Sequence, residues 1–368
     1  MIRVLITGLT DKVGGVDIYI RNIVANIDKS RIRFDFLGQG IEKAALEEEL
    51  SDLCGGQCSF FYAPSFKEHF KDCVEYLRKL YKNNYDVVYV NASLATDVLY
   101  AWPYVEWYKN TKLIIHSHNS SLHGKEKQHY MFKWCTCRAN LKLTCSEKAA
   151  KWMFGSMNRV KLIHNGIDTK RFQYSEQNRK EIRKQYGIAE NEYVIGNVGR
   201  LCYQKNQSFL IDVLKELRDE GTPVYLMLVG EGEYEDKLKK QAEQKGVSDH
   251  VIFCGLQKEI EKYYSAFDVF VMPSWYEGMP IAGVEAQTAG LPCVFSDKID
   301  RQVMLTDRCV MLKADAGVSK WEEEISQILR RSLYDRGRYG EIIEKKGFSI
   351  KKTAKQIGRI VNKFVAEK

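Results

Sequence analysis

Short apolar runs alternate with amphipathic segments along most of the chain. In the first half, β-branched and apolar residues predict strands at 4–7, 34–37, 59–62, 87–90, 113–116, 141–144 and 161–163. Apolar residues three and four positions apart predict helices at 18–27, 43–53, 68–81 and 94–108. The second half repeats the pattern, with strands at 193–198, 224–229, 251–254, 269–272, 292–295 and 310–312, and helices at 207–217, 235–245, 260–267, 281–289 and 321–333.

This alternation predicts an α/β fold in which parallel sheets are covered by helices on both faces. Each half is long enough for one doubly wound, Rossmann-like domain, and a polar junction lies at 165–186. We assign residues 1–168 to the first domain and 169–348 to the second. Because parallel sheets bind ligands at the carboxyl ends of their strands, the two domains are expected to face a cleft.

Residues 349–368 are expected to form a basic C-terminal helix. Its apolar residues fall on one stripe, made of Ile350, Ala354, Ile357, Val361 and Phe364. Its basic residues are Lys351, Lys352, Lys355, Arg359 and Lys363. The pattern predicts a surface helix packed on a domain, and attraction to acidic lipid headgroups is a second interpretation.

The composition is that of a folded globular protein rather than a disordered, collagen-like or coiled-coil one. Of 368 residues, 45% are hydrophobic and 28% are charged, and 56 basic against 48 acidic residues give a net charge of +8. This excess does not indicate nucleic-acid binding, but it suits an anionic ligand or a membrane surface. The 10 cysteines are scattered, and neither a signal peptide nor an apolar run of ~18 residues is visible. We therefore expect a reduced, cytoplasmic protein.

The stretch 273–286 carries the strongest chemical signal. It follows the apolar run 269–272 and precedes a predicted helix with Pro280 near its first turn, so Glu277 is expected on a strand-to-helix loop. Glu285 would lie about one turn into that helix. Gly278 lets the main chain approach a ligand, and the N–H groups after Glu277 would point into the cleft. Two carboxylates and a set of amides suit a polyol with an anionic leaving group, although helix capping and solvated charge explain them equally well.

A second loop, 199–206, follows the predicted strand 193–198. Arg200 offers a planar fork of donors and Lys205 a point charge, and both suit phosphate oxygens. Such a pair is more often surface charge, but its position opposite the two glutamates favours an anion site. Gly14 and Gly15, between the first strand and the first helix, would let an anion approach a helix N-terminus. The chain contains neither a dinucleotide-binding glycine fingerprint nor a P-loop.

Histidines end the predicted strand 113–116. His118, with His116 as the alternative, could donate a hydrogen bond to a substrate oxygen, although a structural histidine is the commoner explanation. A zinc site is a further alternative, with candidate ligands His123, His129, Cys135, Cys137 and Cys145. Residues 135 and 137 would lie on different faces of a helix, so no metal site is expected.

The chain also lacks any pair of aspartates one residue apart, the D-x-D pattern that offers close carboxylates to a divalent cation. A bound diphosphate would therefore have to be neutralised by Arg200, Lys205 and helix dipoles. This favours a reaction that needs no metal.

Taken together and in this order, these motifs resemble the family 4 glycosyltransferases of the GT-B fold, over nearly the whole chain. The likeness runs through 14–15, 118–119, 145–147, 165–168, 196–200, 205–206, 229–232, 253–255, 273–278 and 285–286. Two glutamates separated by seven residues, with Arg and Lys upstream, are the specific combination. The segments 116–120 and 149–155 are most similar to bacterial transferases of capsule and exopolysaccharide assembly.

The resemblance implies a role for each candidate residue. In the second domain, which would bind the nucleotide sugar, Arg200 and Lys205 would hold the diphosphate and Glu285 the ribose. Glu277 would contact hydroxyls of the donor sugar, with the amides around Gly278, Met279 and Pro280 beside it. The first domain would bind the acceptor. There Gly14 and Gly15 would contact phosphate and His118 the transferred sugar, and the last helix would cross back to this domain.

The implied activity is that of a retaining, metal-independent glycosyltransferase without a cofactor. It would move a hexose or N-acetylhexosamine from a nucleotide sugar, preferably UDP-linked, to a hydroxyl of a lipid-linked oligosaccharide in bacterial surface polysaccharide synthesis. The alternatives are a sugar-nucleotide 2-epimerase of related fold and a non-catalytic two-domain protein that binds sugar nucleotides.

The stretch 125–142 mixes basic and aromatic residues. It is compatible with an interfacial helix that touches anionic lipid on the inner face of the plasma membrane. An ordinary helix with one solvated face explains the same residues.

Overall fold

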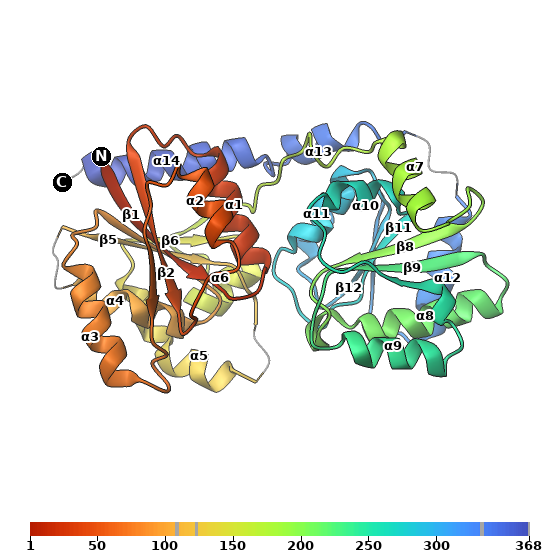
Figure 1. Ribbon diagram of the computed structural model, residues 1–368, viewed down its shortest axis with the longest axis horizontal. Coiled ribbons are helices and arrows are strands. Elements are labelled where there is room, and N and C mark those ends of the chain that lie inside the picture. The colour runs from red at the N-terminus through yellow and green to blue at the C-terminus, as the bar shows by residue number, and fades with distance from the viewer. Residues whose placement is uncertain (107–109, 122–123, 332–334, 367–368) are drawn as a thin grey trace. The chain divides into compact units, whose positions relative to one another are not determined.

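The structure is a computed structural model that describes residues 1–106, 110–121, 124–331 and 335–366. The chain divides into two compact units (Figure 1). Unit 1 contains Met1–Gly166 and Ser349–Lys368, and unit 2 contains Ile167–Phe348. His123 and parts of the predicted helices 94–108 and 321–333 lie outside the described residues.

The described part of unit 1 contains one seven-stranded parallel sheet in the order β3-β2-β1-β4-β5-β6-β7. Its strands are β1 (Ile2–Leu9), β2 (Ile32–Gln39), β3 (Phe60–Ala63), β4 (Val87–Ala92), β5 (Lys112–Ser117), β6 (Leu141–Thr144) and β7 (Val160–Leu162). The strand order changes direction between β1 and β4, which makes this a doubly wound sheet with its topological switch point at that pair.

Helices cover both faces of this sheet. Alternate side chains of the central strands point to opposite faces, so each face buries its own set of them. Val4 and Ile6 of β1 lie with α1 (Gly15–Asn26) and α14 (Ile350–Ala366). Leu5 belongs instead to the core beneath α3 (Phe70–Tyr81), the 3-10 helix η1 (Ala95–Tyr100) and α4 (Trp102–Val105). The remaining helices of unit 1 are α2 (Glu47–Leu53), α5 (Glu126–Phe132), the 3-10 helix η2 (Lys133–Arg138) and α6 (Glu147–Phe154).

The described part of unit 2 contains a six-stranded parallel sheet in the order β10-β9-β8-β11-β12-β13. Its strands are β8 (Tyr193–Val198), β9 (Val224–Val229), β10 (Val251–Phe253), β11 (Val269–Met272), β12 (Cys293–Ser296) and β13 (Cys309–Leu312). The switch point lies between β8 and β11. The predicted α/β class, with two doubly wound parallel sheets, is confirmed, whereas the cleft expected between the units stays a prediction.

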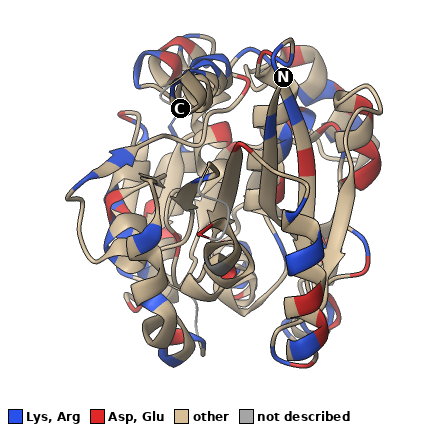
Figure 2. Cartoon of the chain, turned by 90° about the vertical axis from the view of Figure 1, so that its left-hand side faces the viewer, with Lys and Arg blue, Asp and Glu red and all other residues tan. Residues whose placement is uncertain are grey.

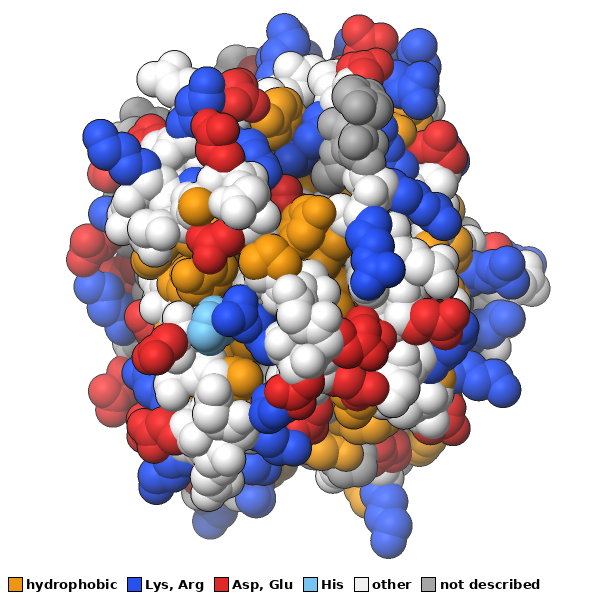
Figure 3. All heavy atoms as spheres, turned by 90° about the vertical axis from the view of Figure 1, so that its right-hand side faces the viewer, with side chains coloured by type: hydrophobic (Ala, Val, Ile, Leu, Met, Phe, Trp, Pro, Cys, Tyr) orange, Lys and Arg blue, Asp and Glu red, His pale blue; other side chains and the backbone are white. Residues whose placement is uncertain are grey.

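The helices in the described part of unit 2 are α7 (Glu176–Gln185), α8 (Gln207–Asp219), α9 (Glu235–Gln244), α10 (Ile260–Ala266), α11 (Ile281–Thr288), α12 (Val318–Leu329) and α13 (Tyr339–Lys345). Residues of α8, α9 and α12 form one apolar core cluster with the strands of unit 2. All four side chains of β11 are buried, as expected for a strand covered on both faces. On β8, a Cβ at Gly196 would lie 2.1 Å from the Phe267 ring, so only glycine fits there. On the face shown in Figure 3, acidic and basic side chains are interspersed.

The C-terminal helix α14 belongs to unit 1. The apolar side chains of its predicted stripe are buried except for Phe364, which is half-buried, and the five basic residues are exposed. Figure 2 shows blue segments along the helix that leads to the C-terminus. Ile357 and Val361 pack beside Ile20, Ile23 and Ile27 of α1 or its end. Thr353 Oγ1 donates a hydrogen bond to the His164 carbonyl, which holds the start of α14 near β7.

The predicted helix 94–108 of unit 1 is wrong as drawn from the sequence, and the stretch 125–142, which was compatible with a helix, is not a single one. The described part of the first segment, 94–106, forms η1 and the short α4, because Ala101 leaves helical geometry (φ −123°) between them. The segment 125–142 is not one helix either, since α5 gives way to the tighter η2, where Thr136 Oγ1 donates to the Lys133 carbonyl. In the junction 165–186 the structure forms α7, whose first turn is capped by the Ser175 hydroxyl.

No helix in the described parts of the chain is both long and apolar enough to cross a bilayer.

Candidate functional site

Two loops of unit 2 leave the sheet at its switch point. The first, Gly199–Asn206, follows β8, and the second, Pro273–Pro280, follows β11. Because β8 and β11 are parallel neighbours, both loops start from the carboxyl edge of the sheet, where doubly wound folds bind their ligands.

The two loops hold each other by hydrogen bonds. The Trp275 N–H donates to the Gln204 carbonyl (2.9 Å), and Gln204 Nε2 donates to the Tyr276 carbonyl (2.8 Å). Asn206 Nδ2 donates to the Pro273 carbonyl (3.3 Å), and the rings of Tyr203 and Trp275 stack at 6.5 Å. The loops are therefore fixed relative to each other rather than placed independently.

Lys205 and Glu277 meet at the centre of this arrangement. Lys205 Nζ lies 2.5 Å from Glu277 Oε1, and the two side chains are only 17% and 11% exposed. An ion pair this short and this little exposed acts where water screens charge weakly. The structure thus brings together a cation and a carboxylate that the sequence placed on separate loops, 72 residues apart.

Arg200 lies on the same loop but differs from Lys205 in its surroundings. Its side chain is exposed, and no partner for its guanidinium is found among the described residues. The loop backbone is tightly packed, because a Cβ at Gly230 would lie 2.3 Å from the Gly199 carbonyl oxygen. This close approach fixes the backbone that carries Arg200 and leaves its guanidinium available to an anion.

The second glutamate lies within α11, a helix that begins after Pro280. Gly278, Met279 and Pro280 are all buried, and Pro280 is the N-cap residue of the helix. Glu285 is 8% exposed, and Tyr264 Oη donates to its Oε2 at 2.8 Å. Burial, with the nearby Glu285 charge, holds the pKa of Tyr264 well above its usual value, so the hydroxyl keeps its proton and donates. Nothing in the sequence pattern predicted this role of Tyr264, which is indistinguishable there from any other aromatic residue of an amphipathic helix.

In unit 1, Gly14 and Gly15 stand at the N-terminus of α1. The Gly14 N–H donates to Asp17 Oδ2 (3.0 Å), and the same carboxylate accepts hydrogen bonds from the Thr10 N–H and hydroxyl. Burial raises the pKa of Asp17, and these hydrogen bonds oppose the rise. A Cβ at Gly15 would meet nothing within 4 Å, so the space beside the helix N-terminus is open. Asp17, which sequence reasoning missed, shapes this loop.

His116 and His118 are both buried at the carboxyl end of β5, with their ring centroids 4.2 Å apart. His116 Nδ1 lies 2.7 Å from Tyr89 Oη, and His118 Nε2 lies 3.0 Å from Asn91 Oδ1. Burial lowers the pKa of His116 well below its usual value and that of His118 to about 3. Both rings are therefore neutral near pH 7.

Of the residues weighed as zinc ligands, those that the structure describes do not gather into a metal site. His129 Nδ1 accepts from the Ala95 N–H, its Nε2 donates to the Trp152 carbonyl, and its ring stacks on Trp152 at 3.7 Å. These contacts give His129 a structural role. In the parts of the chain that the structure describes, no three His, Cys, Asp or Glu side chains are placed to share a metal ion.

Two family models match the chain, one over each unit. The model described as Glycosyltransferase Family 4 matches residues 13–171, and the one described as Glycosyl transferases group 1 matches residues 178–332.

Curated relatives extend over most of the chain. EpsF of Bacillus subtilis (strain 168), which bears the name of a glycosyltransferase, is 31% identical over 85% of this chain and 84% of its own length. A UDP-Gal:α-D-GlcNAc-diphosphoundecaprenol α-1,3-galactosyltransferase of Escherichia coli is 25% identical over 67% of this chain and 68% of its own. Among solved structures, Anabaena HepE in complex with UDP and glucose has a TM-score of 0.83 at 19% identity, over 99% of this chain and 100% of HepE. That likeness concerns the fold.

Proposed function

Because the chain belongs to the group 1 and family 4 glycosyltransferases, as its motifs predict, we propose that it transfers a hexose or N-acetylhexosamine from a nucleotide sugar to a hydroxyl group. The donor is UDP-linked, and the acceptor is a lipid-linked oligosaccharide in the synthesis of a bacterial surface polysaccharide. The reaction retains the anomeric configuration and needs no metal.

The Lys205–Glu277 pair at the switch point of unit 2 carries this proposal. In the structure the two charges neutralise each other. With a donor bound, the Lys205 ammonium would turn to the diphosphate and the Glu277 carboxylate would accept hydrogen bonds from sugar hydroxyls. Such an exchange suits a ligand that brings an anion and a polyol together.

Cleavage of the bond between sugar and phosphate leaves negative charge on the departing diphosphate. Lys205, the exposed Arg200 guanidinium and the N-terminal end of α11 would stabilise that charge as it develops. Groups held in place before the reaction stabilise a transition state without reorganising, and this is why the tie between the two loops matters for the proposal.

The names of relatives support the donor and the acceptor. The E. coli relative uses UDP-Gal, acts on a diphosphoundecaprenol-linked sugar and makes an α-1,3 linkage, and HepE was solved with UDP and glucose. A UDP-α-sugar that yields an α-linked product is a donor whose configuration is retained.

A panel of UDP-, GDP- and ADP-sugars tests the proposal. A donor present at roughly a hundredfold its Kd should stabilise the protein by about 2.7 kcal/mol, measured as a shift in thermal unfolding. The stabilising sugar nucleotide should then slowly release its nucleoside diphosphate, and excess EDTA should not slow this release.

Each other outcome identifies an alternative. Tight binding without turnover would indicate a sugar-nucleotide binding protein, and conversion to an epimeric sugar nucleotide would indicate a 2-epimerase. The loss of turnover in EDTA would contradict metal independence, and the absence of both binding and turnover across the panel would contradict the proposal as a whole.

We further propose that unit 1 touches the membrane that carries the acceptor. Among the described residues, three of the exposed large hydrophobic side chains gather on α5 and η2: Tyr130 (60% exposed), Met131 (66%) and Trp134 (52%). Lys125 and Lys127 are exposed beside them, and Lys133 Nζ lies 5.3 Å from the centre of the Tyr130 ring. Aromatic side chains next to lysines are typical of surfaces that lie in the lipid headgroup region.

Vesicle flotation measures this contact. Each basic residue near an anionic bilayer contributes about 1 kcal/mol, so Lys127→Glu should weaken binding to phosphatidylcholine–phosphatidylglycerol vesicles about fivefold or more. Trp134→Ser should weaken binding to both anionic and neutral vesicles. Lys180→Glu, on α7 of unit 2, makes the same change of net charge and serves as the control. Equal flotation of Lys127→Glu, Trp134→Ser and the unmodified protein would contradict the proposed membrane contact.

A further inference from the structure

Tyr264 and Glu285 form a buried pair on two neighbouring helices of unit 2. Tyr264 lies on α10, which leads into β11, and Glu285 lies on α11, which follows β11. Tyr264 is fully buried, Glu285 is 8% exposed, and Tyr264 Oη donates to Glu285 Oε2 at 2.8 Å. A carboxylate is costly to bury unless donors face it. A donor held in place also fixes the direction in which the carboxylate faces.

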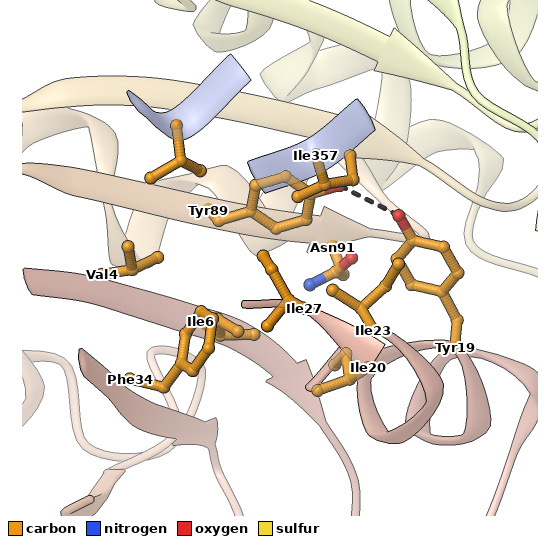
Figure 4. Close-up of a pocket in the computed structure, with 11 residues that line it drawn as sticks. Val4, Ile6, Tyr19, Ile20, Ile23, Ile27, Phe34, Tyr89, Asn91 and Ile357 are labelled. Atoms are coloured by element: carbon orange, nitrogen blue, oxygen red, sulfur yellow. Dashed lines mark hydrogen bonds between the residues drawn. The ribbon is translucent and has the colours of Figure 1, made fainter. Parts of the chain in front are cut away.

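The chemistry of the partner makes this hydrogen bond directional. Tyr19 and Tyr89, which line a largely apolar pocket of unit 1, are joined hydroxyl to hydroxyl at 3.1 Å (Figure 4). In that pair either oxygen can donate. An ionised carboxylate only accepts, so the hydroxyl proton of Tyr264 is committed to Glu285.

The ring of Tyr264 and the helix that carries it are both held in place. The ring centroids of Phe267 and Phe270 lie 5.8 and 6.0 Å from that of Tyr264. The buried Arg336 donates from Nη2 to the Tyr264 carbonyl and from Nε to the Ala289 carbonyl at the end of α11, both at 2.8 Å. Because the same guanidinium ties α10 to α11, the Tyr264 hydroxyl is set against the carboxylate before any ligand arrives.

The position of Glu285 along α11 indicates which part of a nucleotide sugar it would meet. It lies four residues beyond Ile281, the first residue of the helix, and thus about 6 Å along the axis from the end that would face the diphosphate. Glu277 lies before that end, beside Lys205. A nucleotide sugar carries hydroxyls on both sides of its diphosphate, on the transferred sugar and on the ribose. With Glu277 at the transferred sugar, Glu285 would meet the ribose.

We infer that Tyr264 is a positioning residue that holds the Glu285 carboxylate ready to accept hydrogen bonds from ribose hydroxyls. Through this contact the site prefers a ribonucleoside diphosphate to its 2′-deoxy counterpart. The inference rests on the proposed function, because the nucleotide donor brings the ribose. A site built to bond a hydroxyl rejects an analogue that lacks it, since the buried polar group is then left without its partner.

Calorimetric titration of the full chain with UDP and with 2′-deoxy-UDP measures this preference. The unmodified protein should bind UDP about tenfold more tightly, the equivalent of one hydrogen bond to a carboxylate. Tyr264→Phe removes only the hydroxyl, and it should weaken UDP binding about tenfold and reduce the preference to about twofold. The KM for UDP-glucose should rise with kcat little changed, because the ribose takes no part in the bond that breaks. If a GDP- or ADP-sugar stabilises the protein more, that nucleotide and its 2′-deoxy form replace the UDP pair.

Tyr263→Phe is the matched control. Tyr263 is the preceding residue of α10 and is also buried, but its hydroxyl lies 3.2 Å from that of Tyr186. This variant loses the same atom from the same helix and should keep the full preference for UDP. Thermal unfolding verifies that both variants fold.

The ratio of the two affinities separates positioning from mere packing. A Tyr264→Phe protein that binds both nucleotides more weakly by the same factor, with its preference unchanged, would show a structural role and overturn the inference. The unmodified protein decides the matter even without a variant, because equal affinity for UDP and 2′-deoxy-UDP would overturn the inference and leave the proposed function standing. A panel in which no sugar nucleotide binds would contradict the proposed function, and the inference with it.

Discussion

Replacing Lys205 with alanine is expected to lower kcat by about 10²–10³-fold, the usual loss when one well-aimed stabiliser of developing charge is removed. The variant removes the cation closest to Glu277 and leaves that carboxylate, 11% exposed, without its partner. The bare carboxylate would then repel the diphosphate. Release of nucleoside diphosphate and transfer of labelled sugar measure the effect, with thermal unfolding to show that the protein remains folded.

Two companion variants sharpen the interpretation. Arg200→Ala changes an exposed side chain and should also lower kcat strongly with little change in stability. Lys262→Ala is the matched control, because Lys262 is 21% exposed, is paired with Glu181 and Glu259, and lies outside both loops. If Lys205→Ala and Arg200→Ala both kept full turnover, the assigned phosphate site would be wrong.

Gly230→Ala is expected to destabilise unit 2 by about 3 kcal/mol and to impair turnover. Its Cβ would lie 2.3 Å from the Gly199 carbonyl oxygen, and Gly230 has φ +135°, a conformation that alanine rarely adopts. Because the obstacle is backbone rather than a flexible side chain, relief requires the Gly199–Arg200 segment to move. Urea denaturation gives the free energy of unfolding, and the donor assay gives the activity.

Gly246→Ala provides the comparison for this prediction. Gly246 also has a positive φ of +68°, but a Cβ there would meet nothing within 4 Å. It should therefore cost only the backbone strain, about 1 kcal/mol, and leave turnover intact. If Gly230→Ala and Gly246→Ala lowered the free energy of unfolding equally, the close contact with Gly199 would not contribute to the loss of stability.

The central strands could be predicted from the sequence because burial on both faces of the sheet constrains which residues each strand can contain. A strand buried on both faces is apolar at nearly every position, and the runs 193–198, 224–229 and 269–272 match β8, β9 and β11 residue for residue. Helices whose course depends on local hydrogen bonds were harder to predict from the sequence. Periodicity alone did not reveal that Thr136 and the geometry of Ala101 would break up the segments 125–142 and 94–108.

In the candidate site, too, some features could be predicted from the sequence and others could not. Lys205 and Glu277 could be placed on loops at one sheet edge, since each follows a recognisable strand. The partners that orient the site could not, because Tyr264, Asp17 and Asn91 act through hydrogen bonds whose geometry exists only in the folded chain. No spacing in the sequence distinguishes such a residue from an ordinary buried side chain.

The position of α14 has a consequence for the order in which the protein is made. The chain leaves unit 1 after Gly166 and returns to it only at Ser349, where α14 goes on to cover Ile20, Ile23 and Ile27. During synthesis, the ribosome releases nearly all of unit 1 first, yet that apolar surface stays bare until all of unit 2 has been translated. The N-terminal half of the nascent chain is thus an incomplete folding unit and a natural client for chaperones that shield exposed apolar surface.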